Sequence, residues 1–391
     1  MTKKLLIIVF AGLSSTMAFA ADLYVRNGGT GGAYSTVSAA ITAASDGDRI
    51  IIQPKINGSA YVENITINKS LTFVSETNYN KYFIQGTITI NPAAGRVVTI
   101  SNLSSGDYSI YSVVASGPTT GGRTTINLYN CYLNKVITNQ ANTTTNISGS
   151  SVLGEISFSH GRVTANKAQS IYANSTATDT SLATSDIEVY GNAASFGVSH
   201  SQSNYNFKFY NNFCRGVFVY AIKTGSNNEI INNTIYDPYG GDIAPFSINL
   251  NNGNTGNISI MNNAASFVVG ATNVCISNNN NATVTASYNV FTNPFVTQGA
   301  MTQSNNSGGV NMNFSETAFT VTGMNVNAGN PDVSYTDLDL TRNDAGHYGG
   351  SNSWANYWPA DNGGRPQVNY MLTPRTISSG TLNISGSGFS K

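Results

Sequence analysis

Charged residues are scarce in this 391-residue chain: Asp, Glu, Lys and Arg make up 10% of it, against about 25% in a typical globular domain. The 19 basic and 19 acidic residues cancel, so the sequence offers no electrostatic basis for binding nucleic acid or an anionic membrane. The 21 Tyr and 17 Phe residues nevertheless predict a packed interior rather than disorder. The expected surface is therefore dominated by amides and hydroxyls.

Cysteine is also rare, and long apolar runs are missing beyond the N-terminus. Cys131, Cys214 and Cys275 are expected to be buried as small apolar side chains, with one disulfide and one free thiol as the alternative. No later run approaches the roughly 20 apolar residues that span a bilayer. Residues 1–20 have the pattern of a secretory signal peptide, with two lysines, an apolar run and small residues before the cut. The sequence thus predicts a secreted, extracellular or cell-surface protein without a transmembrane segment.

Helical periodicity is missing over most of the chain, and a strand followed by a turn recurs instead. Residues 207–212 are one copy, in which apolar and polar residues alternate before two asparagines, as in a strand with one buried face. The first turn residues of successive copies are predicted at Asn102, Asn130, His160, Gly191, Asn211, Asn232, Asn262 and Tyr288. By subtraction these positions are 20 to 31 residues apart, which is typical of the coils of a parallel β-solenoid. Asparagines at the same place on successive coils are expected to form a ladder of side-chain amides.

Both ends of the repeat carry cap-like sequences. Val37, Ala40, Ile41 and Ala44 form the apolar stripe of a short helix that is expected to begin after an N-cap at Ser35 and to cover the first coil. At the other end, residues 352–370 contain both Trp residues and are expected to cover the last coil.

Two stretches carry a resemblance to a known family. Residues 34–41, together with 46–52, 61–65 and 69–73, resemble the N-terminal cap of the pectin-lyase-like superfamily, and of pectin methylesterases in particular. Residues 337–350 resemble the closing segment of many secreted bacterial β-helix proteins. The resemblance implies an all-β, right-handed parallel β-helix, which we expect to have roughly 10 to 12 coils. The predicted division is a signal peptide at 1–20, the β-helix with its N-terminal cap at 21–350, and a C-terminal cap and tail at 351–391.

The catalytic groups of the related enzymes are not recognisable on the central repeats. Pectin methylesterases use paired Asp residues beside Gln and Arg, and polygalacturonases use clustered Asp residues with an Arg-x-Lys element. A lyase needs only carboxylates that hold Ca²⁺ and one Arg or Lys as base. For that alternative the candidates are Arg215, Lys223, Asp237 and Asp242, although solvated outer faces explain them more simply.

Other side chains in the sequence suggest contacts with ions or sugars. Lys208 and Glu229, each just before its turn, are expected to lie near one another. Asp337, Asp339, Asn343 and Asp344 supply oxygen ligands for Ca²⁺, or form a structural turn without metal. Trp354, Tyr357 and Trp358 form a glycan-binding platform, or are buried in a cap.

The sequence therefore favours a non-catalytic β-helix protein that acts as a structural or glycan-binding element. Its partner would be a polysaccharide or a surface protein, and Ca²⁺ is the one cofactor suggested. The alternative is a polysaccharide lyase or a related carbohydrate-active enzyme of the same superfamily.

Overall fold

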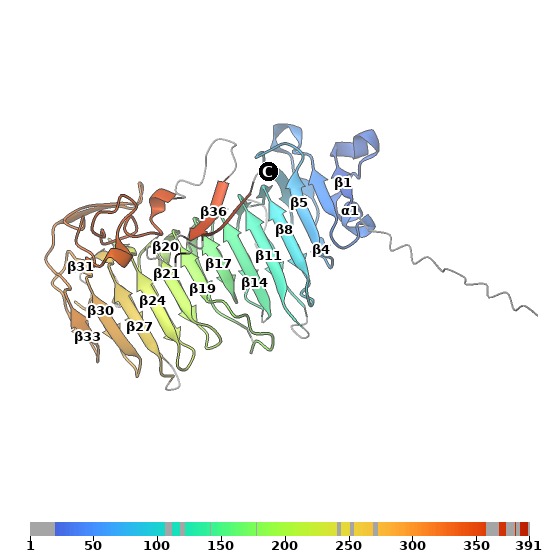
Figure 1. Ribbon diagram of the computed structural model, residues 1–391. Coiled ribbons are helices and arrows are strands. Elements are labelled where there is room, and N and C mark those ends of the chain that lie inside the picture. Colours follow the sequence, from blue (N-terminus) through green and yellow to red (C-terminus); the bar gives the residue numbers. More distant parts are fainter. Residues whose placement is uncertain are drawn as a thin grey trace, which may run out of the picture.

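The chain folds as a parallel β-helix, a rod of stacked coils, in the computed structural model (Figure 1). The structure describes residues 20–105, 112–117, 122–140, 142–176, 178–240, 244–250, 254–268, 273–356, 367–372, 380 and 384–389. The fold class predicted from the repeat is confirmed. The proposed signal peptide lies outside the described residues, except for Ala20.

One side of the rod is a parallel sheet of 13 strands, one from each coil. At about 4.8 Å between neighbouring strands this sheet is about 58 Å long, slightly longer than 10 to 12 coils would give. Its strands, in order, are β1 (Asp22–Val25), β2 (Arg49–Ile52), β5 (Leu71–Ser75), β8 (Val97–Ser101), β11 (Thr124–Tyr129), β14 (Thr143–Ser148), β17 (Gly161–Thr164), β19 (Ile187–Tyr190), β21 (Phe207–Tyr210), β24 (Asn227–Ile231), β27 (Asn257–Met261), β30 (Thr283–Ser287) and β33 (Thr302–Ser304).

A second sheet of 20 strands forms the other two sides of each coil. The second side follows the corner after the first sheet and holds β3 (Tyr61–Val62), β6 (Tyr82–Gln85), β9 (Leu103–Ser104), β12 (Tyr132–Leu133), β15 (Ser151–Val152), β22 (Phe213–Cys214), β25 (Thr234–Asp237), β28 (Ala264–Phe267) and β31 (Val290–Phe291). The third side holds β4 (Ile65–Ile67), β7 (Ile88–Ile90), β10 (Val113–Ala115), β13 (Val136–Thr138), β16 (Glu155–Phe158), β23 (Val217–Ala221), β26 (Phe246–Ile248), β29 (Ile276–Asn278) and β32 (Thr297–Gln298). The long strands β18 (Lys167–Ala173) and β20 (Ala193–Ser201) run along both of these sides.

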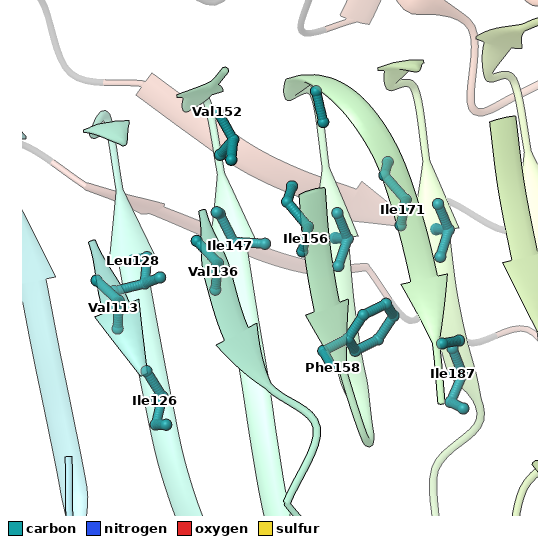
Figure 2. Close-up of a cluster of buried hydrophobic side chains, with 14 of the residues drawn as sticks. Val113, Ile126, Leu128, Val136, Ile147, Val152, Ile156, Phe158, Ile171 and Ile187 are labelled. Atoms are coloured by element: carbon teal, nitrogen blue, oxygen red, sulfur yellow. The ribbon is translucent and has the colours of Figure 1, made fainter. Parts of the chain in front are cut away.

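Alternate residues of every side point inward and fill one continuous core. Figure 2 shows side chains from facing strands, such as Val113 and Leu128, meeting between the sheets. Each buried aliphatic or aromatic side chain of this kind contributes about 1.5–3 kcal/mol of hydrophobic stabilisation. Cys131, Cys214 and Cys275 lie in this core as buried free thiols, so the prediction of small apolar fillers is confirmed over a disulfide. Burial raises the pKa of the Cys131 and Cys275 thiols to about 11 and that of Cys214 to about 12.

The corner after the first sheet uses left-handed backbone angles. Asn102, Asn130, Asn211, Asn232, Asn262 and Tyr288 all have φ between 51° and 60°, as their predicted turn positions require, and Gly191 has φ 63°. Asn suits this position because its short side chain tolerates the left-handed region.

The prediction for His160 is wrong, because this residue follows β16 on the third side. Two corners were missed instead, at Gly149 (φ 59°) and Ala165 (φ 55°). Neither carries the expected Asn, and by subtraction only 16 residues separate them, so these coils are shorter than the repeat that the sequence suggested.

From the corner at Ala165 onward, the residue after each corner builds the amide ladder that the sequence predicted. Its members are Asn166, Asn192, Asn212, Asn233, Asn263, Asn289 and Asn306. Each Nδ2 donates to the Oδ1 of the next at 2.8–3.0 Å. The same Oδ1 accepts a backbone N–H, and each Nδ2 also reaches a carbonyl of the preceding coil, as between Asn233 and Phe209. The ladder thus supplies hydrogen-bond partners to buried backbone N–H and C=O groups at the corner, where the chain bends and strand pairing is interrupted.

A short helix covers the N-terminal end of the core. This helix, α1 (Val37–Ala43), buries Val37, Ala40 and Ile41 against the first coils, and the capping helix is confirmed. Its N-cap is Thr36 rather than Ser35, because the Thr36 hydroxyl accepts the Ala39 N–H. The short 3-10 turns are η1 (Asn27–Gly32), η2 (Ile56–Gly58), η3 (Val333–Tyr335) and η4 (Trp354–Asn356). No helix in the described ranges is long and apolar enough to cross a bilayer.

The chain turns back after β33, and residues 310–356, called the return segment below, lie along the corner of the rod (Figure 1, orange). The segment begins with an antiparallel hairpin of β34 (Met312–Ser315) and β35 (Thr320–Gly323). The corner asparagines then hold it: Asn211 donates to the carbonyls of His347 and Gly349, and Asn232 donates to Asp344. A separate hairpin pairs β36 (Gln367–Leu372) with β37 (Ser385–Phe389).

This course corrects the predicted position of the C-terminal cover. Trp354 packs on Ala193 and Phe213, in the middle of the rod and not on its last coil. The side-chain amides of successive corner asparagines donate hydrogen bonds along this edge of the rod. The return segment accepts them as it runs from the last coil back toward the middle of the rod.

Candidate functional site

A hollow of about 490 Å³ lies on the outer surface of the third side. Its volume is within the range of small-molecule sites, about 300–1,000 Å³. It is lined by Val114, Ile137, Asn139, Glu155, Ser157, Tyr172 and Asn174.

The stacking of the coils explains why the hollow forms. Val114, Ile137, Ser157 and Tyr172 are register partners on β10, β13, β16 and β18, so their side chains form one outward row about 4.8 Å apart. Ser157 is much shorter than its neighbours Ile137 and Tyr172. The row therefore dips at Ser157, and the two larger side chains form opposite walls.

Polar groups line the rest of the hollow. The Ser157 hydroxyl lies 2.9 Å from Asn174 Oδ1, to which it donates, so the amide of Asn174 has a fixed orientation. The carbonyl of Asn139 accepts the N–H of Thr176 at 3.0 Å, which holds the loop after β18 beside this wall. Glu155 lies 3.7 Å from Lys135 Nζ, and both side chains are about one-third exposed. The two charges cancel, so the pair leaves the rim of the hollow without net charge. An ion pair this exposed adds less than about 1 kcal/mol to the stability of the fold.

This arrangement offers the groups that bind a sugar. Amides, a hydroxyl and a carboxylate hydrogen-bond to sugar hydroxyls, and the Tyr172 ring offers an apolar face. Glycoside hydrolysis requires two carboxyl groups on either side of the bond. The seven lining residues include one, Glu155.

Of the candidate lyase residues that the structure describes, Arg215 and Asp237 both contact Tyr239, and Lys223 lies apart from them. Arg215 donates to Glu316 of the return segment at 3.2 Å and lies 4.2 Å from the centre of the Tyr239 ring. Asp237, on a neighbouring coil, accepts the backbone N–H of Tyr239. Lys223 lies beyond the far end of β23, which separates it from Arg215 by the whole strand, about 16 Å. Asp242 lies outside the described residues.

Lys208 and Glu229 are register partners on β21 and β24, so their predicted proximity is confirmed. Lys208 Nζ is 3.0 Å from Asp186, and Glu229 accepts the Tyr210 hydroxyl. Burial alone would lower the pKa of Lys208, but the contacts with Asp186 and Glu229 outweigh it and raise that pKa. A lysine held in its charged form is a poor general base at neutral pH.

The four proposed Ca²⁺ ligands hold the turns of the return segment together. Asp337 accepts the N–H groups of Gly350 and Asp344, at 2.6 and 2.9 Å. Asp339 accepts from Thr341, the Asp344 carboxylate accepts the N–H of residue 327, and Asn343 donates to the carbonyl of residue 335. Within the part of the chain that the structure describes, no three His, Cys, Asp or Glu side chains gather as a metal site requires. These hydrogen bonds are those of a structural turn, one of the two alternatives that the sequence offered for this segment.

Trp354 cannot stack on a sugar in this structure, because it is 1% exposed. Its ring packs between Phe213, Phe319 and His347, as the buried-cap alternative predicts. Tyr357 and Trp358 lie outside the described residues.

The sequence did not reveal the residues of the hollow. They lie on strands whose coils differ in length, so their shared row becomes visible only once the register is known. Searches against known protein families, curated proteins and solved structures find no match to this chain.

Proposed function

We propose that this chain is an exported, non-catalytic β-helix protein that binds a glycan in the hollow around Ser157 and Tyr172. The N-terminal pattern at residues 1–20 supports export to the outside of the cell or to its surface. The cap-like sequences support membership of the pectin-lyase-like superfamily.

The observation that carries the proposal is the combination of groups in one hollow. Asn139, Asn174, Ser157 and Glu155 supply donors and acceptors around the apolar faces of Ile137 and Tyr172. A sugar likewise combines polar and apolar groups, with hydroxyls at its edge and C–H groups on its faces. A pocket that offers both matches a sugar better than it matches a purely apolar ligand.

Co-sedimentation with insoluble polysaccharides tests the proposal. The purified protein is mixed with cellulose, xylan, mannan, chitin and β-1,3-glucan, and with polygalacturonate gels, while reducing ends and unsaturated products are followed in the same samples. We expect retention on at least one polysaccharide without cleavage. Tyr172→Ala should abolish retention and Glu155→Gln should weaken it.

Tyr24→Ala is the matched control, because Tyr24 is an exposed tyrosine on β1 in the other sheet. It should bind like the unmodified protein. Retention that is equal in Tyr172→Ala and Tyr24→Ala would refute the site, and no retention on any polysaccharide would refute the function. Unsaturated products would establish the lyase alternative instead.

A further inference from the structure

A patch of two aromatic side chains, Phe218 and Tyr220, lies on the outer face of β23, on the same side of the rod as the hollow and beyond it. Tyr220 is 38% exposed and Phe218 is half-buried. Phe196 and Tyr239, which are 52% and 68% exposed, lie against Arg215 near the corner between the second and third sides. The register connects this patch to the hollow, since Tyr172 pairs with Ser199 and Ser199 pairs with Phe218. Phe218 therefore lies two strands from Tyr172, about 10 Å along the axis of the rod.

The aromatic rings are held in fixed positions. Phe218 lies against the backbone of two glycines, and a Cβ added at Gly197 would come within 3.0 Å of its ring, with even less space at Gly216. The rings of Phe218 and Tyr220 are nearly parallel, at 21°, with centres 6.4 Å apart. Ser199, a small residue, is the register partner between Tyr172 and Phe218, so no large side chain of this row stands between the hollow and the patch.

The charges along this path are balanced. Lys135 is paired with Glu155 at the hollow, and Arg215 is paired with Glu316 beside the patch. The exposed Lys223 lies three residues past Tyr220, beyond the end of β23. A polyanionic chain of uronic acids would bring one carboxylate per sugar to a path along which Lys135 and Arg215 are already neutralised, with Lys223 beyond its end. A neutral chain has no such cost of burying unpaired charge.

We infer that the ligand is a linear neutral polysaccharide that runs along the third side, from the hollow to the rings of Phe218 and Tyr220. This inference rests on the proposed function. From Ser157 to Phe218 the path covers three strand spacings, about 14 Å, which is longer than a single sugar. Stacking on a rigid aromatic ring adds affinity at little entropic cost, so the sugars beyond the hollow contribute to binding.

Calorimetric titration with oligosaccharides of two lengths tests the inference. The probes are β-1,4-linked disaccharides and hexasaccharides of glucose, mannose, xylose and N-acetylglucosamine, with the hexamer of galacturonic acid as the acidic counterpart. We expect at least one neutral hexamer to bind tenfold or more tightly than its disaccharide. Phe218→Ala and Tyr220→Ala should remove that gain and leave the disaccharide affinity unchanged.

Two further variants separate stacking from folding and from background binding. Phe218→Leu keeps an apolar cover over the glycines but lacks the flat ring, so it should also lose the gain. Tyr24→Ala matches Tyr220→Ala, because both tyrosines are 38% exposed, and it should change neither affinity.

The outcomes distinguish the inference from the function on which it rests. Equal affinity for the two lengths, or tightest binding of the galacturonic acid hexamer, would overturn the inference. If Tyr172→Ala still abolished disaccharide binding in that case, the proposed function would stand. If none of the probes bound, the inference would be rejected, and retention in the co-sedimentation assay, which also includes β-1,3-glucan, would decide the proposed function.

Discussion

Replacement of one asparagine in the middle of the amide ladder should destabilise the protein far more than replacement of an exposed one. Asn233 accepts from the backbone N–H and the Nδ2 of Asn212, and it donates to Asn263 and to the carbonyl of Phe209. Asn233→Ala leaves the buried Asn212 N–H without its acceptor and removes one partner each from the Asn212 amide and the Phe209 carbonyl. At about 1–3 kcal/mol for a buried polar group that loses its partner, we expect a loss of about 3–6 kcal/mol.

The control is Asn257→Ala, which removes an asparagine pair between the same two coils. Asn257 donates to Asn227 at 2.7 Å, but both residues are exposed, so water replaces the lost bond. The expected change in the free energy of unfolding is within about 0.5 kcal/mol.

Guanidinium denaturation followed by circular dichroism measures both variants, and hydrogen exchange at the Asn212 amide reports the ladder directly. Asn233→Asp is a stricter variant, because a carboxylate has the same shape but cannot donate to Asn263 or Phe209. We expect it to be at least as destabilising as Asn233→Ala. If the Asn233 variants were no less stable than Asn257→Ala, the ladder would not have the role given to it here.

Three further predictions follow from buried groups. Burial lowers the pKa of His160 and His200 to about 4 and that of His347 to about 3, so the unfolded chain takes up these protons first and stability is lost as pH falls below about 6.5. Between pH 7 and pH 4.5 the three histidines together lower the free energy of unfolding by about 8 kcal/mol. Burial raises the pKa of Asp337 to about 6, so this carboxyl group raises the free energy of unfolding by about 2 kcal/mol over the same range. A melting temperature unchanged between pH 7 and 4.5 would contradict this balance. Trp354→Ala should lower the free energy of unfolding by about 3–5 kcal/mol and speed hydrogen exchange in residues 343–349. Unchanged exchange there would show that Trp354 does not fix the return segment. Gly161→Ala should cost several times more than Gly225→Ala in the same denaturation assay, because both have positive φ but only at Gly161 would a Cβ overlap a carbonyl, that of Thr145.

The sequence was sufficient for the architecture because the repeat is local. Asn211 and Asn212, for example, mark a corner and a ladder position within six residues of an alternating strand. The failures arose where the local signal was weak, as at Gly149 and Ala165, whose coils lack the first Asn. The position of Trp354 depended on contacts with residues more than 100 positions away, which no local pattern encodes.

The candidate site was harder to predict for the same reason. The hollow needs a short Ser157 between Ile137 and Tyr172, and these residues are neighbours only through the register of three coils of unequal length. The sequence instead drew attention to charged residues, of which Arg215 contacts Glu316 and Lys208 contacts Asp186.

The most direct test of glycan binding on the third side is hydrogen exchange of the whole protein, measured with and without the neutral hexasaccharide that it binds best. We expect slower exchange in β16, β18, β20 and β23, with the amides around Ser157, Tyr172, Ser199 and Phe218 affected most. Protection confined to the first sheet or to the return segment would contradict it.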